Sequence, residues 1–197
     1  MIREIDERRS IRKFLSKPLP ESEIREIIAS GIKAPSSKNR QPWRFIVITG
    51  RSKKEMLEAF RRGIYREEHG EALLPESKKH MAAAKYTVEI LEQAPVVIFA
   101  VNSLGQGIFK DMTKEEKIYE ICNIQSISAA IQNMLLAAEE KGIGSLWVCD
   151  IYFAYQELCE WLGDEGELIA AVALGYPDEA PAQRPRKKFD EVVQWRD

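Results

Sequence analysis

The chain has 197 residues, of which 45% are hydrophobic and 30% are charged. Its 29 basic and 31 acidic side chains leave a net charge of −2 at pH 7, which excludes a uniformly basic nucleic-acid binder, because neutralising phosphates requires a surplus of lysine and arginine. The 7 Phe, 6 Tyr and 4 Trp exclude general disorder, and the length fits one domain spanning residues 1–197.

Apolar periodicity, prolines and capping residues predict an alternation of helices and buried strands. In chain order the expected elements are a helix at 2–9, a helix at 20–34, a strand at 45–48, a helix at 52–62, a helix at 77–93, a strand at 96–101, a helix at 113–141, a strand at 145–149, a helix at 156–162 and a strand at 168–174. Because the connections vary in length, we expect an α+β sandwich with a mixed sheet.

Local signals refine these expectations. Ser52 with Glu55, and Thr113 with Glu116, have the spacing of a capping box and predict two helix starts. The polar stretch 63–76 is predicted to be a mobile loop. The helix at 113–141 is apolar over much of its circumference but contains scattered polar side chains, which favours a central buried helix over a membrane span.

Three cysteines, Cys122, Cys149 and Cys159, form an odd set without CxxC spacing. They indicate a reducing compartment, and neither of the two histidines lies near them, so no zinc pattern is present. The N-terminus has no apolar signal core. We therefore expect a soluble cytoplasmic protein without a metal site.

Three polar segments are candidates for chemistry. Arg8, Arg9, Ser10 and Arg12 place three guanidiniums and a hydroxyl within five residues, and 184–188 is a second basic block. Guanidinium forks match phosphate oxygens, so two such blocks in a slightly acidic chain are consistent with one anion site. The alternative is a solvated helix end and an exposed tail. The third segment, 35–43, is a proline-stiffened loop that either binds a polar heterocycle or simply connects a helix to a strand.

The blocks RRSIRKF, APSSKNRQPWRFIVI, IQNMLLAAEEKGIGSLWV, LGYP and RPRKKFDEVV, in this order, resemble the FMN-dependent nitroreductase family over nearly the whole chain. The resemblance implies a three-layer α+β sandwich with a mixed, mainly antiparallel sheet flanked by helices. It also implies an obligate homodimer with two FMN molecules at the subunit interface.

The resemblance also implies the site residues. Arg8, Ser10, Arg184 and Arg186 match positions that bind the FMN phosphate, with Arg9 between them, and Arg12 matches a basic position near the flavin N1 and C2 carbonyl. The remaining matches are the loop that approaches the flavin from the partner subunit and the strand end whose backbone lies along it: Pro35, Ser36, Ser37, Asn39 and Gln41, and then Trp147, Val148, Cys149 and Asp150.

The implied activity is a ping-pong cycle in which NADH or NADPH gives hydride to the flavin N5 and a nitroaromatic, quinone or related electrophile is then reduced. A cation at Arg12 would stabilise the charge of the reduced flavin. Cys149 and Asp150 replace a Glu-Gly pair seen in some members, and Cys149 is either a redox-active thiol or a small packing residue. The loops 63–76 and 103–112 are expected to shape the substrate pocket.

Other functions stay open. The same fold supports reductive dehalogenation and oxygen-dependent cleavage of FMN. A non-catalytic module for FMN storage or redox sensing is a further alternative.

Overall fold

The computed structural model describes residues 2–163 and 166–196. Within them the strands form one antiparallel sheet in the order β1-β2-β4-β3. The strands are β1 (Trp43–Ile48), β2 (Val96–Asn102), β3 (Gly144–Val148) and β4 (Glu167–Gly175). Every residue of the central strands β2 and β4 is buried, as their continuous apolar runs predict. β1 and β3 are the edges.

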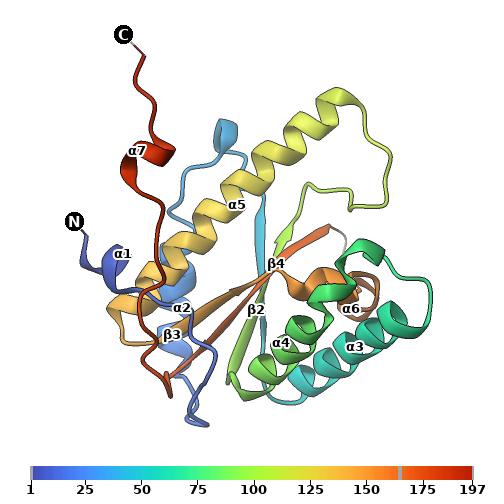
Figure 1. The fold of residues 1–197 in the computed structure, drawn as a ribbon, viewed down its shortest axis with the longest axis horizontal. Coiled ribbons are helices and arrows are strands. Elements are labelled where there is room, and N and C mark those ends of the chain that lie inside the picture. Colours follow the sequence, from blue (N-terminus) through green and yellow to red (C-terminus); the bar gives the residue numbers. More distant parts are fainter. Residues whose placement is uncertain (1, 164–165, 197) are drawn as a thin grey trace.

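Helices cover both faces of this sheet (Figure 1). The helical elements are α1 (Arg3–Glu7), α2 (Glu21–Gly31), η1 (Ser37–Asn39), α3 (Gly50–His69), η2 (Pro75–His80), α4 (Met81–Gln93), α5 (Lys114–Glu140), η3 (Asp150–Ala154), α6 (Tyr155–Leu162) and α7 (Phe189–Val192). α3, α4, η3 and α6 pack against one face, and α2 and α5 pack against the other. The expected three-layer α+β arrangement is confirmed.

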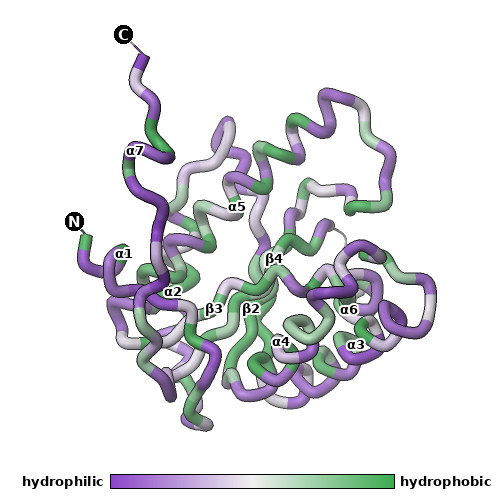
Figure 2. Tube along the Cα trace, in the orientation of Figure 1, coloured by the Kyte–Doolittle hydropathy of each residue, from purple (hydrophilic) through white to green (hydrophobic). Residues whose placement is uncertain are grey.

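Alternation along β2 divides the core into two halves. Val97, Phe99 and Val101 join the cluster under α3 and α4, whereas Ile98 and Ala100 join the cluster under α5. Successive strand side chains point to opposite faces of a sheet, so a strand between two helical layers must be apolar on both. Figure 2 shows the result, a hydrophobic centre along the strands inside a largely polar periphery.

The capping-box expectations had different outcomes. At α5 the box is present: the Glu116 backbone N–H donates to Thr113 Oγ1 at 3.2 Å, and the Thr113 N–H donates to Glu116 Oε2 at 2.7 Å. At α3 the prediction from Ser52 was wrong. That helix begins at Gly50 after Thr49, without a side-chain cap, because its start is set by the end of β1 two residues earlier.

α5 is long and apolar enough to cross a membrane by length and composition alone, a test that core helices of soluble proteins also pass. Ile127, Ala130, Ile131 and Met134 on this helix are completely buried against the sheet and α2. These contacts give α5 the role of the central core helix that the sequence predicts.

The expected loop at 63–76 was wrong in its first half, because α3 continues to His69. Gly63 lies so close to η3 that an added Cβ would be 2.3 Å from Ala154 Cα. Glu67 is 2% exposed and accepts hydrogen bonds from Arg66 and from the backbone N–H groups of Leu73 and Leu74. The close packing of Gly63 against η3 and the burial of Glu67 thus extend a helix that local polarity predicts to end.

The expected mixed sheet is antiparallel in all its strand pairings within the described residues. Parallel pairing is limited there to one isolated bridge, between Ser10 and Ser145. The N-terminal segment thus runs beside the edge strand β3 for too short a distance to become a strand of its own.

The N-terminal segment, residues 11–15, is hydrogen-bonded both to β3 and to the residues that follow β4. The Ile11 N–H donates to Ser145 O, the Leu15 N–H donates to Tyr176 O, and the Asp178 N–H donates to Lys13 O, at 2.9–3.0 Å. Gly144 allows this close approach, because a Cβ there would be 3.0 Å from the Ile11 side chain and would push it away. Residues 8–12 consequently lie beside the segment that follows β4, from which α7 projects away from the body (Figure 1).

Candidate functional site

The two arginine-rich blocks, from opposite ends of the sequence, line one small cavity of about 100 Å³. Its lining includes Arg8, Arg9, Ser10, Arg12, Arg184 and Arg186. The hydrogen bonds that join residues 11–15 to β3 and to residues 176–178 create this meeting. Two basic blocks that are ordinary on their own therefore form a single basic cluster.

The guanidinium groups of the basic cluster are not paired with carboxylates. Within residues 2–163 and 166–196, none of its five arginines is in ion-pair contact with a carboxylate. The pKa of Arg8 is lowered by partial burial and then by the like charge of Arg186, the charge of Glu139 opposes this, and the like charge of Arg9 adds a smaller lowering effect. Cations held together without ion-pair partners form a site that an anion would stabilise.

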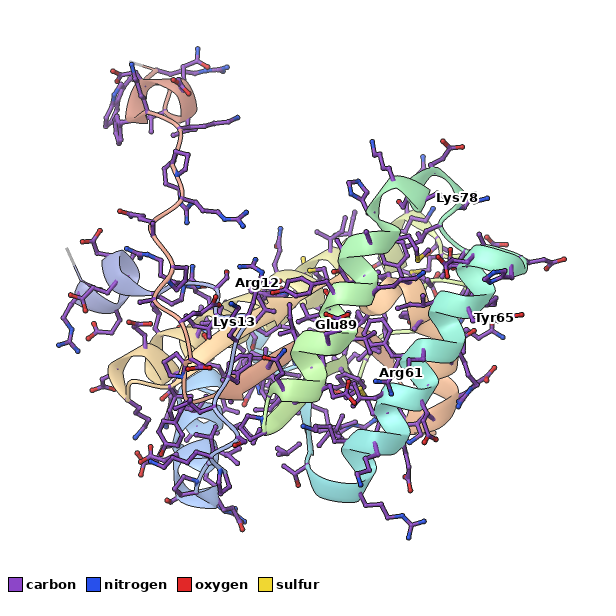
Figure 3. The ribbon with its side chains drawn as sticks, turned by 60° about the horizontal axis from the view of Figure 1, so that its bottom comes forward. Arg12, Lys13, Arg61, Tyr65, Lys78 and Glu89 are labelled. Atoms are coloured by element: carbon purple, nitrogen blue, oxygen red, sulfur yellow. The ribbon has the colours of Figure 1, made fainter. Side chains whose placement is uncertain are left out.

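Arg12 is positioned by one backbone and one side-chain hydrogen bond. Its N–H donates to Glu179 Oε1 at 2.5 Å, and its Nη1 donates to Ser10 O at 3.2 Å. Figure 3 shows Arg12 and Lys13 on the N-terminal segment, across α4 from Arg61 and Tyr65 of α3. The guanidinium therefore belongs to the β3 edge of the molecule, where the other arginines of the basic cluster lie.

Residues 147–150 run from the end of this edge strand into the start of η3. Trp147 packs in the core half under α5 and Val148 in the half under α3 and α4. The Thr87 hydroxyl of α4 donates to Asp150 Oδ2 at 2.6 Å, which fixes the backbone where β3 ends. Cys149 is exposed, and the pKa of its thiol is raised by partial burial and by the charge of Asp150. The raised pKa disfavours the thiolate, and the two interpretations of Cys149, a redox-active thiol or a small packing residue, stay open.

The loop 35–41 has an unusual backbone. Lys38, Asn39 and Gln41 have positive φ values of 52°, 53° and 48°, a conformation that costs a non-glycine residue free energy and that collects at functional sites. Internal hydrogen bonds support it, because the Gln41 N–H donates to Ser36 Oγ and the Gln41 side chain donates to Asn39 Oδ1. Pro35 and Ser36 precede η1, which begins at Ser37.

The structure does not bring this loop to the basic cluster of the same chain. The Ser37 N–H donates to Ser126 Oγ in the first half of α5, at 3.2 Å, whereas the cavity beside the cluster is lined by Glu139 near the end of α5. At 1.5 Å per residue, these points lie roughly 20 Å apart along the helix.

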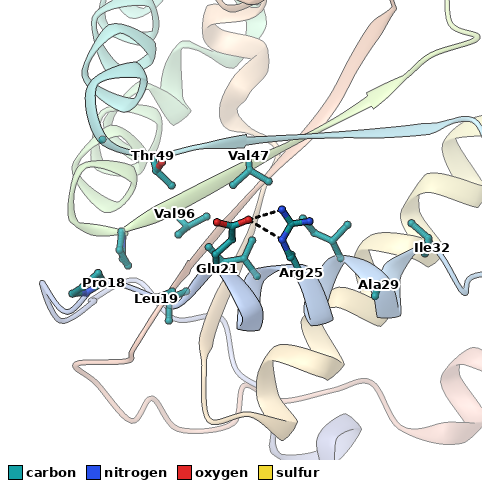
Figure 4. A pocket seen from close by; sticks show the side chains of 13 residues that line it. Pro18, Leu19, Glu21, Arg25, Ala29, Ile32, Val47, Thr49 and Val96 are labelled. Carbon is teal, nitrogen blue, oxygen red and sulfur yellow. Dashed lines mark hydrogen bonds and ion pairs between the residues drawn. The ribbon is translucent and has the colours of Figure 1, made fainter.

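A larger cavity, about 780 Å³, lies elsewhere, between α2 and the edge strand β1 (Figure 4). Its lining is mainly apolar, with Leu19, Ile32 and Val47 among its residues. Its charged residues, Glu21 and Arg25, neutralise each other in an ion pair one helical turn apart. Size alone would select this cavity, but the charges that could hold a ligand group are at the basic cluster.

Comparison with known proteins identifies the family of the chain. The model of the family described as "Nitroreductase family" matches residues 5–176. The chain belongs to the nitroreductase family. The resemblance given by the sequence is therefore confirmed, and with it the expectation of an oxidoreductase.

Individual members show how broad this family is. A Bacillus subtilis protein named as a proposed NAD(P)H nitroreductase, YfhC, is 29% identical, covering 92% of this chain and 87% of its own. The 5,6-dimethylbenzimidazole synthase of Rhodospirillum rubrum is also 29% identical, covering 87% and 79%. A Desulfovibrio desulfuricans nitroreductase solved in complex with FMN superimposes with a TM-score of 0.71 and 25% identity, covering 100% and 96%.

Sequence reasoning missed a second group of polar residues in this nitroreductase fold. The Asn102 side chain donates to Glu120 Oε1 at 2.7 Å, and Glu167 lies buried beside both. Burial, and then the hydrogen bond and charge of Glu120, raise the pKa of Glu167 to about 8. Arg40 and Asn123 lie nearby. The sequence signal for this group is the polar residues that interrupt the apolar pattern of α5. They argue against a membrane span, but they also mark a buried polar group.

Proposed function

We propose that this protein is an FMN-dependent oxidoreductase that uses NADH or NADPH to reduce nitroaromatics, quinones or related electrophiles in a ping-pong cycle. The observation that carries the proposal is the convergence of Arg8 and Arg12 with Arg184 and Arg186 on one cavity without counter-charges. A phosphate monoester supplies the missing negative charge and several acceptor oxygens. The donor set therefore fits the FMN phosphate.

Each group of residues has a defined task in this proposal. The basic cluster, with the Ser10 hydroxyl, holds the phosphate, and Arg12 stabilises negative charge at the flavin N1 and C2 carbonyl. The backbone at Val148, Cys149 and Asp150, fixed by the bond from Thr87, presents an N–H toward N5. FMN itself supplies the ability to accept a hydride and pass it on.

The functional unit in this proposal is a homodimer. The loop 35–41 lies roughly 20 Å along α5 from the basic cluster of its own chain, so it serves the flavin of a partner subunit. Exposed apolar side chains support a second copy as the partner: Ile118 and Ile121 on α5 are 60% and 55% exposed, and Trp195 on the projecting arm is 82% exposed. Such side chains mark association surfaces. The three free cysteines fit a reducing cytoplasm.

The experiment that tests the proposal begins with binding. We expect the purified protein to bind FMN with quenching of flavin fluorescence, and the bound flavin to bleach rapidly when NADH or NADPH is added without oxygen. A protein that stays colourless after incubation with FMN would overturn the proposal. Bound flavin that bleaches only very slowly with either nucleotide would instead indicate a storage or sensing module.

A second candidate is favoured by the synthase of Rhodospirillum rubrum, which matches over most of both chains. Its name indicates chemistry in which a dimethylbenzimidazole is made, and FMN cleavage by oxygen is the corresponding reaction for this chain. Incubation of the reduced flavoprotein with oxygen, followed by product analysis, separates the candidates. We expect intact FMN to be recovered, and conversion of FMN to 5,6-dimethylbenzimidazole would assign the second function.

A further inference from the structure

A second polar cavity, distinct from the basic cluster, lies between the loop 35–41 and the start of α5. Its volume is about 110 Å³. The loop contributes Arg40, the segment after β2 contributes Gln106, and α5 contributes Glu116, Glu120 and Asn123. No role has been assigned to this cavity so far.

Two buried polar atoms of this lining have no hydrogen-bond partner among the described residues, Asn123 Oδ1 and Arg40 Nη1. Asn123 is only 1% exposed. A buried polar group without a partner costs about 1–3 kcal/mol, and native structures contain few of them. An unpaired donor and an unpaired acceptor beside the same cavity therefore indicate a ligand that has both functions.

The guanidinium of Arg40 is held in place without being neutralised. It lies over the ring of Tyr119, with Cζ 4.8 Å from the ring centroid, and the strained backbone of Asn39 and Gln41 is on either side of it. A side chain oriented by stacking and by its backbone has lost its freedom before a ligand arrives, so little ordering cost remains for binding.

The charges of the lining restrict the ligand further. Glu116 and Glu120 line the same cavity as Arg40. Because one cation faces two carboxyl groups, an anionic ligand would gain little electrostatic free energy by binding there. Hydrogen bonds from the Thr113 backbone and hydroxyl hold the pKa of Glu116 below its ordinary value, which keeps that carboxylate charged. The favoured ligand group is neutral, small and planar, with an acceptor and a donor side by side.

A primary carboxamide has these properties, because its carbonyl oxygen accepts and its NH2 group donates. We propose that this cavity binds a primary carboxamide, with Arg40 Nη1 donating to the carbonyl oxygen and Asn123 Oδ1 accepting from the NH2 group. The carboxamide is that of the nicotinamide ring of the electron donor. This last step rests on the proposed function, in which Asn39 and Gln41, the neighbours of Arg40, line the flavin site.

Binding of small aromatic probes tests the carboxamide site directly on the purified full-length protein. Benzamide carries the acceptor and the donor, acetophenone carries only the acceptor, and benzoate is an anion. By calorimetry we expect benzamide to bind about tenfold more tightly than either analogue, the loss typical of one unmade hydrogen bond in a buried site. Equal binding of the three probes would overturn the site, and this comparison needs no variant.

Variants connect the site to the nucleotide. With Asn123→Leu, the KM for NADH or NADPH should rise about tenfold, and the analogue with an acetyl group in place of the carboxamide should become as good a donor as the natural nucleotide. Asn123→Asp keeps an acceptor and should retain the discrimination. Gln125→Leu, an exposed change of amide to apolar on the same helix, is the matched control and should behave as the unaltered protein.

The outcomes also separate this inference from the proposed function. Rapid oxidation of NADH or NADPH with unchanged discrimination in Asn123→Leu would overturn the inference and leave the function intact. A protein that binds no FMN but prefers benzamide through Asn123 would support the carboxamide site and overturn the function.

Discussion

At the scale of single residues, the proposed function assigns the exposed arginines of the basic cluster a role through charge rather than through packing. Arg184 and Arg186 are exposed, and within the described residues Arg186 donates to backbone carbonyls of its own tail. We therefore expect substitution of either arginine to weaken anion binding and to leave the fold unchanged. The interaction can be tested by truncating one arginine at a time.

Arg186→Ala should weaken FMN binding by roughly 10- to 150-fold, because a hydrogen bond to a charged group contributes about 1.5–3 kcal/mol. Fluorescence titration measures this affinity. Lys187→Ala is the control, since Lys187 is in the same basic tail but outside the cavity lining. Equal affinities of the two variants would contradict the phosphate role of Arg186.

Glu167 gives a prediction for pH dependence. Its folded-state pKa is raised to about 8 by burial and by Glu120, so the folded protein holds the proton more tightly than the unfolded chain does. Between about pH 5 and about pH 8 the free energy of unfolding should fall as pH rises, by at most about 1.4 kcal/mol per pH unit, and this loss should stop above pH 8.

Glu167→Gln should flatten this slope, because the amide cannot ionise. Urea unfolding at a series of pH values measures it, and Glu160→Gln, on the exposed face of α6, is the control. Tyr152, Tyr155 and Cys159 also surround Glu167, but burial raises the pKa of all three, so they stay neutral across this range. An unaltered slope in Glu167→Gln would show that another group carries it.

At the scale of elements, α3 shows how packing can reverse a local preference. Alanine normally stabilises a helix relative to glycine by about 1 kcal/mol. At Gly63, however, the added methyl group would meet Ala154 of η3 at 2.3 Å. Gly63→Ala should therefore destabilise the protein by about 1–3 kcal/mol.

Thermal or urea unfolding decides the sign of this effect. The neighbouring exposed position gives the control, Arg62→Ala, which should change the free energy of unfolding by less than about 0.5 kcal/mol. A stabilised Gly63→Ala variant would mean that α3 and η3 do not pack this closely.

The same elements explain what the sequence could and could not predict. Strands β2 and β4 were predictable because buried apolar runs are a local property, and the Thr113 capping box located the start of α5 for the same reason. The end of α3, residues 63–69, could not be predicted in this way. The hydrogen-bond partners that hold Glu67 there are backbone N–H groups of the loop after the helix, and local sequence does not show that the loop folds back. The basic cluster could be expected from the family resemblance, whereas Asn123 and Arg40 become neighbours only when α5 packs beside the loop 35–41.

At the scale of the whole molecule, the two segments assigned to the proposed flavin site lie apart in one chain. The basic cluster lies at the β3 edge and near the end of α5, and the loop 35–41 lies at the first half of the same helix. In the proposed homodimer two copies bring these segments together, so we expect the proposed cofactor to be lost when the dimer dissociates.

Ile121→Glu should shift the protein toward monomer, because a buried charge without a partner opposes association. Sedimentation velocity measures the shift, and FMN affinity should fall in parallel. Gln156→Glu, on the exposed face of α6, adds the same single negative charge away from α5 and is the control. A monomeric Ile121→Glu variant that keeps its full FMN affinity would refute the shared site.

The hydrogen bonds that join residues 11–15 to β3 and to residues 176–178 have a consequence for folding. They connect Ile11 to Ser145, Leu15 to Tyr176 and Lys13 to Asp178, which are far apart in the sequence, and such non-local contacts cost loop-closure entropy before they are made. The two arginine-rich blocks therefore meet only in a chain whose sheet has formed, and in the proposed function FMN binding would stabilise that late step.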